Sequence, residues 1–209
     1  MASCYAGNAD AENTGTTNVD SRCRYLPLTR LISYNGHELQ IELSCFRGDA
    51  EYQQGFELMN MVIAEGKSWP YLECFSTMAQ YRAYFHSHAS FAVRFSDQIT
   101  YGTEILGCFY VKPNFPGRCS HVCNGGFITH PKYRGLGIGT FMGEAFKKIA
   151  KDLGYRCSLF NLVFANNTSS VALWKKLGFV ELAVIPGAAV LNGTDGYVDA
   201  IQMFYDFTA

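Results

Sequence analysis

The chain has 209 residues, of which 48% are hydrophobic, and its 17 Lys and Arg nearly balance its 18 Asp and Glu. This balance excludes the broad basic field of a nucleic-acid-binding surface, although a few backbone N–H groups can still build one small anion site. No apolar run reaches the roughly 18 residues that a membrane-spanning helix needs. We therefore expect neither nucleic acid nor a membrane as a partner.

Residues 1–20 contain no Lys or Arg and three acids, so they lack the basic start of a secretory signal and the arginines of a transit peptide. We predict a flexible arm over residues 1–22 and a single domain over residues 23–209. Cytoplasmic residence follows as an expectation, with mitochondrial residence unsupported by this N-terminus. The eight cysteines are then expected as free thiols rather than disulfides.

In the first half of the chain, alternation over residues 39–43 predicts a strand. Apolar residues at helical spacing predict a helix over residues 52–64 that ends at Gly66. We then expect a helix over 78–87, strands over 90–95 and 105–111, a loop at 113–117 and a short strand over 126–129.

The second half has the order helix, strand, helix, strand, strand. Seven apolar side chains from Phe141 to Leu153 form one stripe of a helix that starts at Gly139 and ends at Gly154. The remaining expectations are a strand over 158–164, a helix over 169–177 capped by Asn167 or Thr168, and strands over 180–185 and 198–205. This order predicts an α/β fold, a mixed sheet with helices on both faces.

The most specific feature is a glycine-rich loop just before the stripe-bearing helix: Arg134, Gly135, Leu136, Gly137, Ile138, Gly139 and Thr140. A helix N-terminus offers unpaired N–H groups, and glycines let a phosphate approach the backbone closely. The loop lacks the Gly-Lys-Ser/Thr of a Walker A motif, and its spacing differs from the dinucleotide fingerprint. Two readings remain from the spacing alone, namely a pyrophosphate loop and a glycine-rich turn without a ligand.

Arg134, Gly137 and Gly139 match R/Q-x-x-G-x-G/A, and the segment from Asn167 to Phe179 looks like N-x-x-A-x-x-x-Y-x-K-L-G-F. With these two motifs the chain resembles the GNAT acetyltransferases. The resemblance implies a mixed, mostly antiparallel central sheet flanked by helices, and acetyl-CoA as co-substrate without a metal. It implies that residues 134–140 bind the pyrophosphate, and that Phe127, Ile128, Thr129 and Asn167 lie along the pantetheine arm.

Residues 105–201 more closely resemble the fungal L-azetidine-2-carboxylate N-acetyltransferases, through the segments 105–114, 118–127, 159–164, 186–193 and 198–201. This resemblance implies acetylation of the ring nitrogen of a small cyclic imino acid by a homodimer. It also places Asn124 and Asn161 near the substrate, although each can equally be a core amide with satisfied hydrogen bonds. The backbone N–H of Phe127 or Ile128 is the implied oxyanion donor, with an ordinary paired strand as the alternative.

The general base is left open between His121, Glu65 and a water held by Asn161. Cys119, His121 and Cys123 lack a second pair of ligands with zinc-ribbon spacing, so we expect no metal. Trp174 stands where the family has a tyrosine that can protonate the leaving thiolate, and an indole cannot act as that acid. We expect it to be a packing residue.

Lys67 is expected near the mouth of the substrate site, with a solvated loop lysine as the alternative. Two alternatives to the imino-acid acceptor stay open: another amine, such as a polyamine or a peptide N-terminus, and an acyl-CoA-binding protein without turnover.

Overall fold

The computed structural model describes residue 23 and residues 25–208, so the predicted arm over residues 1–22 lies outside the described residues. One eight-stranded sheet forms the centre of the molecule, in the order β1-β2-β3-β4-β5-β6-β8-β7. The strands are β1 (Leu28–Tyr34), β2 (His37–Cys45), β3 (Ala89–Phe95), β4 (Ile105–Pro113), β5 (Val122–Thr129), β6 (Cys157–Phe164), β7 (Val180–Val190) and β8 (Tyr197–Asp206). Every neighbouring pair is antiparallel except β5 and β6.

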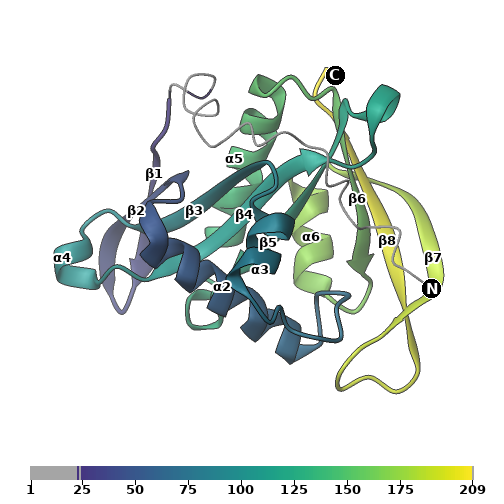
Figure 1. The fold of residues 1–209 in the computed structure, drawn as a ribbon, viewed down its shortest axis with the longest axis horizontal. Coiled ribbons are helices and arrows are strands. Elements are labelled where there is room, and N and C mark those ends of the chain that lie inside the picture. The colour runs from purple at the N-terminus through teal and green to yellow at the C-terminus, as the bar shows by residue number, and fades with distance from the viewer. Residues whose placement is uncertain (1–22, 24, 209) are drawn as a thin grey trace.

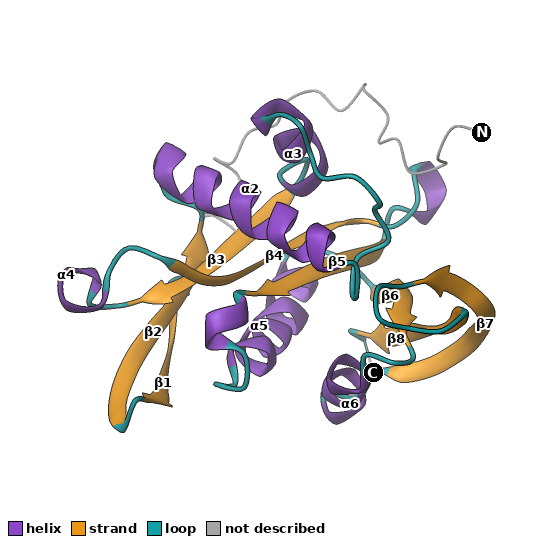
Figure 2. Ribbon diagram, turned by 90° about the horizontal axis from the view of Figure 1, so that it is seen from below, coloured by secondary structure: helices purple, strands orange, loops and turns teal. Residues whose placement is uncertain are grey.

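Helices cover both faces of the sheet, as predicted. The α-helices are α2 (Gly48–Glu65), α3 (Met78–Phe85), α4 (Gln98–Tyr101), α5 (Ile138–Asp152) and α6 (Thr168–Lys176). Helices α2 and α3 lie on one face, and α5 and α6 lie on the other (Figures 1 and 2). None of the described helices is long and apolar enough to cross a bilayer.

Local sequence explains where the helices begin and end. Helix α2 ends at Gly66, which takes a left-handed φ of 64° that a residue with a side chain rarely adopts. The Thr77 side chain accepts a hydrogen bond from the Gln80 N–H and so caps α3. The predicted stripe of α5 is buried against the sheet, with Phe146 and Met142 fully enclosed.

Three elements differ most from the sequence-based expectation, while β5 begins at Val122 instead of residue 126 and α2 at Gly48 instead of residue 52. Strand β1 was not predicted, and neither was α4, a single turn whose first N–H groups are capped by Asp97. Strand β7 runs past its predicted end at residue 185 to Val190 and includes Pro186. Its register with β8 shifts between Ile185 and Ala189, and an edge strand with such an irregularity can accommodate a proline.

A buried ion pair ties α2 to the sheet. The guanidinium of Arg94 on β3 is fully enclosed and donates to both carboxylate oxygens of Glu51 on α2, at 2.6 and 2.8 Å. It also donates to the Ser44 hydroxyl at 2.6 Å and to the Cys45 carbonyl at 3.1 Å. The remaining donors of the arginine are thereby satisfied within the core, so this pair is structural.

The thiols of Cys74, Cys108, Cys119, Cys123 and Cys157 are free, as the cysteine analysis predicted. Cys4 lies outside the described residues. Cys123 is buried in the core beneath α5, whereas Cys119 is exposed. Among the described residues no group of three potential metal ligands comes together.

Candidate active site

The centre of the sheet opens into a fork between β5 and β6. Strand β5 pairs with β4 along its whole length, from Cys123 opposite Pro113 to Thr129 opposite Gly107. It pairs with β6 only at Val122 with Cys157 and at Cys123 with Ser158, and the strands diverge beyond these two positions. Figure 2 shows β6, β8 and β7 set apart from the part of the sheet that contains β1–β5.

The hydrogen bonds to β4 show which backbone groups of β5 face the fork. The His130 N–H donates to the Leu106 carbonyl at 2.9 Å, and the Val122 carbonyl accepts from Asn114 at 2.8 Å. Backbone groups of successive residues point to opposite edges of a strand, so even-numbered residues of β5 face β4. The N–H of Phe127 therefore points into the fork, while that of Ile128 belongs to the ladder with β4. Of the two predicted oxyanion donors, Phe127 has the suitable orientation.

The glycine-rich loop follows β5 directly and leads into α5. Gly135 and Gly137 have φ of 83° and 79°, which explains why glycine occupies both positions. A Cβ at either position would meet nothing within 4 Å, so the loop is open on its outer side. Gly137 is also the N-cap residue of α5 and brings no side chain to its first N–H groups. An open backbone concavity at a helix N-terminus fits a diphosphate.

Arg134 at the start of this loop is held by Glu65, the last residue of α2. Its Nη2 lies 2.9 Å from Glu65 Oε2 and 3.1 Å from Oε1. Asn192, between β7 and β8, donates to the carbonyls of Glu65 and Gly66 at 3.2 and 2.9 Å. The end of α2 thus contacts both the glycine-rich loop and the β7–β8 connection. The carboxylate of Glu65, a predicted base, is committed to Arg134 in this arrangement.

Asn167 is the N-cap residue of α6 and Trp174 lies within this helix, on the β6 side of the fork. The Asn167 side-chain oxygen accepts from the Ser170 N–H at 3.2 Å, which confirms the predicted cap. Its amide N–H groups remain as donors for a ligand. Trp174 is buried, its indole N–H donates to the Ser170 hydroxyl, and its ring packs on Phe127 and Phe160. The prediction that Trp174 is a packing residue is confirmed.

An aromatic wall, which we call the tyrosine cluster, covers β4 and β5 on the face that carries α3. It consists of Tyr71, Tyr84 and Tyr110 together with Trp69. The hydroxyls of Tyr84 and Tyr110 are 3.1 Å apart, and the rings of Tyr71 and Tyr84 are 5.4 Å apart in an edge-to-face contact. Gly126 on β5 faces the same wall, since a Cβ there would lie 2.5 Å from the Tyr110 ring and 2.7 Å from Trp69.

Three amides lie on this face. Asn124 accepts from the Gly125 N–H at 2.8 Å through its own Oδ1. Asn161 on β6 exchanges two hydrogen bonds with Asn114, at 3.0 and 2.6 Å, and so joins the end of β4 to the strand beyond β5. The buried-amide argument required a partner for Asn161, and that partner is Asn114. The structure therefore brings Asn124 and Asn161 to the same face of the sheet as the tyrosine cluster.

Two other predicted residues are placed differently. His121 is exposed just before β5, and within the described part of the chain its imidazole makes no hydrogen bond or ion pair. Lys67 is exposed in the loop after α2, next to Gly66. The structure does not bring the His121 ring into contact with the amides, so its assignment as base stays a prediction without geometric support.

Sequence reasoning missed the tyrosine cluster, Asn114 and Lys112. The detectable signal was in β4, where Tyr110 and Lys112 bring polar groups to alternate positions of an otherwise apolar strand. Lys112 lies opposite Asn124, and its Nζ is 4.0 Å from the centre of the Tyr84 ring and 4.3 Å from that of Tyr110. Burial lowers the pKa of Lys112 to about 8.

The fold, the fork and the anion loop define a class of protein. Residues 55–179 match the acetyltransferase (GNAT) family, and this is more than half of the chain. The chain therefore belongs to the GNAT acetyltransferase family, whose members use acetyl-CoA.

Among curated proteins, the chain is similar to N-acetyltransferase aca1 of Schizosaccharomyces pombe, with 48% identity over 109 residues that span 52% of each chain. It is also similar to protein SPT10 of Saccharomyces cerevisiae, with 27% identity over 192 residues, 71% of this chain and 30% of SPT10. The matches thus span about half the length, or less, of these relatives.

Solved structures agree with this fold. A GCN5-related N-acetyltransferase from Kribbella flavida has a TM-score of 0.71 at 26% identity, covering 79% of this chain and 97% of its own. YncA from Salmonella typhimurium, determined with acetyl-CoA, has a TM-score of 0.69 and covers 80% of this chain and 94% of its own. At 14% identity the second similarity concerns the fold alone.

Proposed function

We propose that this protein transfers the acetyl group of acetyl-CoA to the ring nitrogen of a small cyclic imino acid, such as azetidine-2-carboxylate or a proline analogue. The observation that carries the proposal is the wall of the fork, where three amides stand beside a tyrosine cluster. Aromatic faces suit the CH₂ groups of a small ring, and amides can orient a ring N–H. The similarity to a protein named N-acetyltransferase aca1 supports N-acetyl transfer.

Each residue has a defined task in this proposal. Bound acetyl-CoA supplies the thioester that the amine attacks. Arg134 and the N–H groups of residues 135–140 would hold the diphosphate, and a side-chain N–H of Asn167 would bind the pantetheine arm. The Phe127 N–H stabilises negative charge that develops on the acetyl oxygen. Asn124 and Asn161 orient the ring nitrogen.

Proton removal from the amine is the remaining task. Glu65 is engaged by Arg134, and the His121 ring is exposed outside the amide group. We therefore assign the base to a water held by Asn161, the third of the alternatives left open by the sequence. Trp174 contributes no acid, so the leaving thiolate takes its proton from water or from the product ammonium.

The test is thiol release from acetyl-CoA by the purified protein. We expect release with L-azetidine-2-carboxylate and cis-4-hydroxyproline, and none above the no-amine control with spermidine. Thiol release with spermidine alone would contradict the proposal of an imino-acid acceptor and leave the family assignment unchanged. Tight acetyl-CoA binding without release for any amine would instead favour the acyl-CoA-binding alternative.

Paired alanine variants separate a contact role of Asn161 from a scaffolding role. Asn161→Ala and Asn114→Ala each remove the same two reciprocal hydrogen bonds. We expect Asn161→Ala to lower kcat about 100-fold or more, as for loss of a group that positions a reactant, and Asn114→Ala to lower it about tenfold. Steady-state kinetics at saturating acetyl-CoA measures both values. Equal losses would mean that Asn161 only supports the strand.

We also propose the homodimer that the resemblance implies, and cytoplasmic residence. The edge strand β7 leaves Val180, Leu182 and Val184 between 53% and 57% exposed, which is compatible with a contact between two copies. Sedimentation equilibrium tests the dimer, and a purely monomeric species at micromolar concentration would contradict it.

A further inference from the structure

We propose that Lys112 is the cation that binds the carboxylate of the acceptor, and that it selects amines carrying an acid group next to the nitrogen. The inference rests on the proposed function, because it assigns one more residue to the same acceptor site. Lys112 lies on β4 directly opposite Asn124 of β5, on the face of the sheet that carries the tyrosine cluster.

Lys112 is a half-buried ammonium group without a carboxylate partner. Its Nζ donates to the Tyr84 carbonyl at 3.3 Å and stands over the rings of Tyr84 and Tyr110. Within the described part of the chain, no Asp or Glu oxygen lies within 4 Å of it. Ring faces and a carbonyl orient an ammonium group but do not neutralise it. One positive charge therefore remains for an anion.

The spacing of Lys112 and Asn124 suits an α-imino acid. In such an acceptor a single carbon separates the nitrogen from the carboxylate, so the groups that hold them must be neighbours. Residues directly opposite each other in an antiparallel pair have Cβ atoms about 5 Å apart. Asn124 can orient the nitrogen while Lys112 holds the acid. The same charge repels polyamines, which carry no acid group.

The charge of Lys112 makes anion binding dependent on pH. The titratable groups that face it are Tyr84 from α3, Tyr110 on β4 and His88 before β3, and Tyr71 from the loop before α3 packs on Tyr84. Burial raises the pKa of all three tyrosines, that of Tyr110 to about 12, and burial lowers the pKa of His88. Lys112, with a pKa of about 8, is the facing group that loses its charge just above neutral pH. Anion affinity should be constant below about pH 8 and fall about tenfold per unit above it.

Cyclobutanecarboxylate and cyclobutanecarboxamide test this inference, because neither carries an amine and they differ in the acid group alone. Calorimetric titration of the full chain saturated with CoA gives both affinities. At pH 7 we expect the carboxylate to bind at least about tenfold more tightly than the amide, the effect of one charge-assisted contact. Lys112→Met should abolish the preference, and Lys112→Arg should keep it at pH 9.

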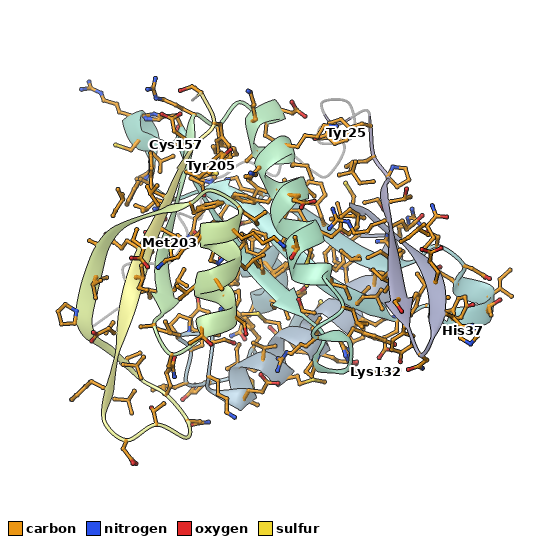
Figure 3. All side chains as sticks on the ribbon, turned by 180° about the vertical axis from the view of Figure 1, so that it is seen from behind. Tyr25, His37, Lys132, Cys157, Met203 and Tyr205 are labelled. Atoms are coloured by element: carbon orange, nitrogen blue, oxygen red, sulfur yellow. The ribbon has the colours of Figure 1, made fainter. Side chains whose placement is uncertain are left out.

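Lys148→Met is the matched control. Lys148 also places its Nζ over a tyrosine, 3.5 Å from the centre of the Tyr25 ring. Tyr25 lies beside α5, on the side of the molecule away from α2 and α3 (Figure 3). This variant removes the same charge and the same kind of ring contact, so its carboxylate preference should equal that of the wild type.

Several results would overturn the inference: a carboxylate preference that survives in Lys112→Met, no detectable binding of the carboxylate to the wild type, or an affinity that does not change between pH 7 and 10. A loss of kcat in Lys112→Met with the preference retained would make Lys112 a base instead. Failure of the proposed function alone would look different. Imino acids would then cause no CoA release, while the wild type would still bind cyclobutanecarboxylate more tightly than cyclobutanecarboxamide.

Discussion

Replacing Glu51 with Gln is expected to lower the free energy of unfolding by about 3–5 kcal/mol, because it leaves the fully buried guanidinium of Arg94 without its main counter-ion. The carboxylate of Glu51 accepts two of the hydrogen bonds of Arg94, and only 6% of the residue is exposed. Glu42 lies 3.3 Å from Arg94 but is shared with Arg47 at 2.7 Å. Glu42 therefore replaces part of the lost negative charge, and we expect the loss of unfolding free energy at the lower end of this range.

Urea unfolding measures this effect as a shift of the midpoint at constant slope. Asp49→Asn is the control, because Asp49 lies on the same helix as Glu51 and its side chain is 96% exposed, although it forms an ion pair with Arg82 of α3 at 2.8 Å. That change should cost less than about 1 kcal/mol. A double replacement of Glu51 and Arg94 by apolar residues should recover much of the loss. If Glu51→Gln costs no more than Asp49→Asn, the pair is not stabilising.

Replacing Gly126 with Ala is expected to lower kcat/KM for the acceptor by about 100-fold and to leave the KM for acetyl-CoA nearly unchanged. The new methyl group would lie 2.5 Å from the Tyr110 ring and 2.7 Å from Trp69, both closer than side chains pack. The rings must move, and with them the wall that positions the acceptor. A displacement of about 1 Å is enough for an effect of this size. Steady-state kinetics with each substrate varied in turn measures both parameters.

Gly125→Ala provides the matched comparison on the neighbouring residue. Its methyl group would lie 2.7 Å from the Phe146 ring and 2.8 Å from the Phe127 ring, in the core beneath α5. We expect this variant to lose mainly stability, about 1–3 kcal/mol, as overpacked cores do. If the two variants have the same kinetic defect, glycine is needed for the backbone of β5 and not for the acceptor wall.

Most of the fold follows from local sequence patterns. The stripe of α5 and the glycines around it predicted that helix closely, because both signals lie within one continuous segment. Strand β1 escaped prediction because it is a sheet edge, where Leu31 is 58% exposed and Ile32 alone is buried. The burial of its residues alternates, but its apolar and polar residues do not alternate in the sequence. Helix α4 has four residues and no apolar face to detect.

The candidate site was likewise predicted only in part. The anion loop is one local motif, so it was visible in the sequence. The acceptor wall is not, because the contact between Asn114 and Asn161 spans 47 positions and that between Tyr84 and Tyr110 spans 26. The roles open to Glu65 also depend on a distant residue, Arg134, 69 positions away. Only the register of β4 and β5 places Lys112 opposite Asn124.

Strands β5 and β6 pair at only two positions, so backbone hydrogen bonds fix little of the angle between them. The Trp174 side chain contacts both strands, since its ring centre lies 4.7 Å from that of Phe127 on β5 and 4.6 Å from that of Phe160 on β6. The indole therefore packs between β5 and β6 where their backbone pairing has ended. The separation of β5 and β6 beyond their last paired residues thus depends on the size of one buried side chain rather than on backbone hydrogen bonds.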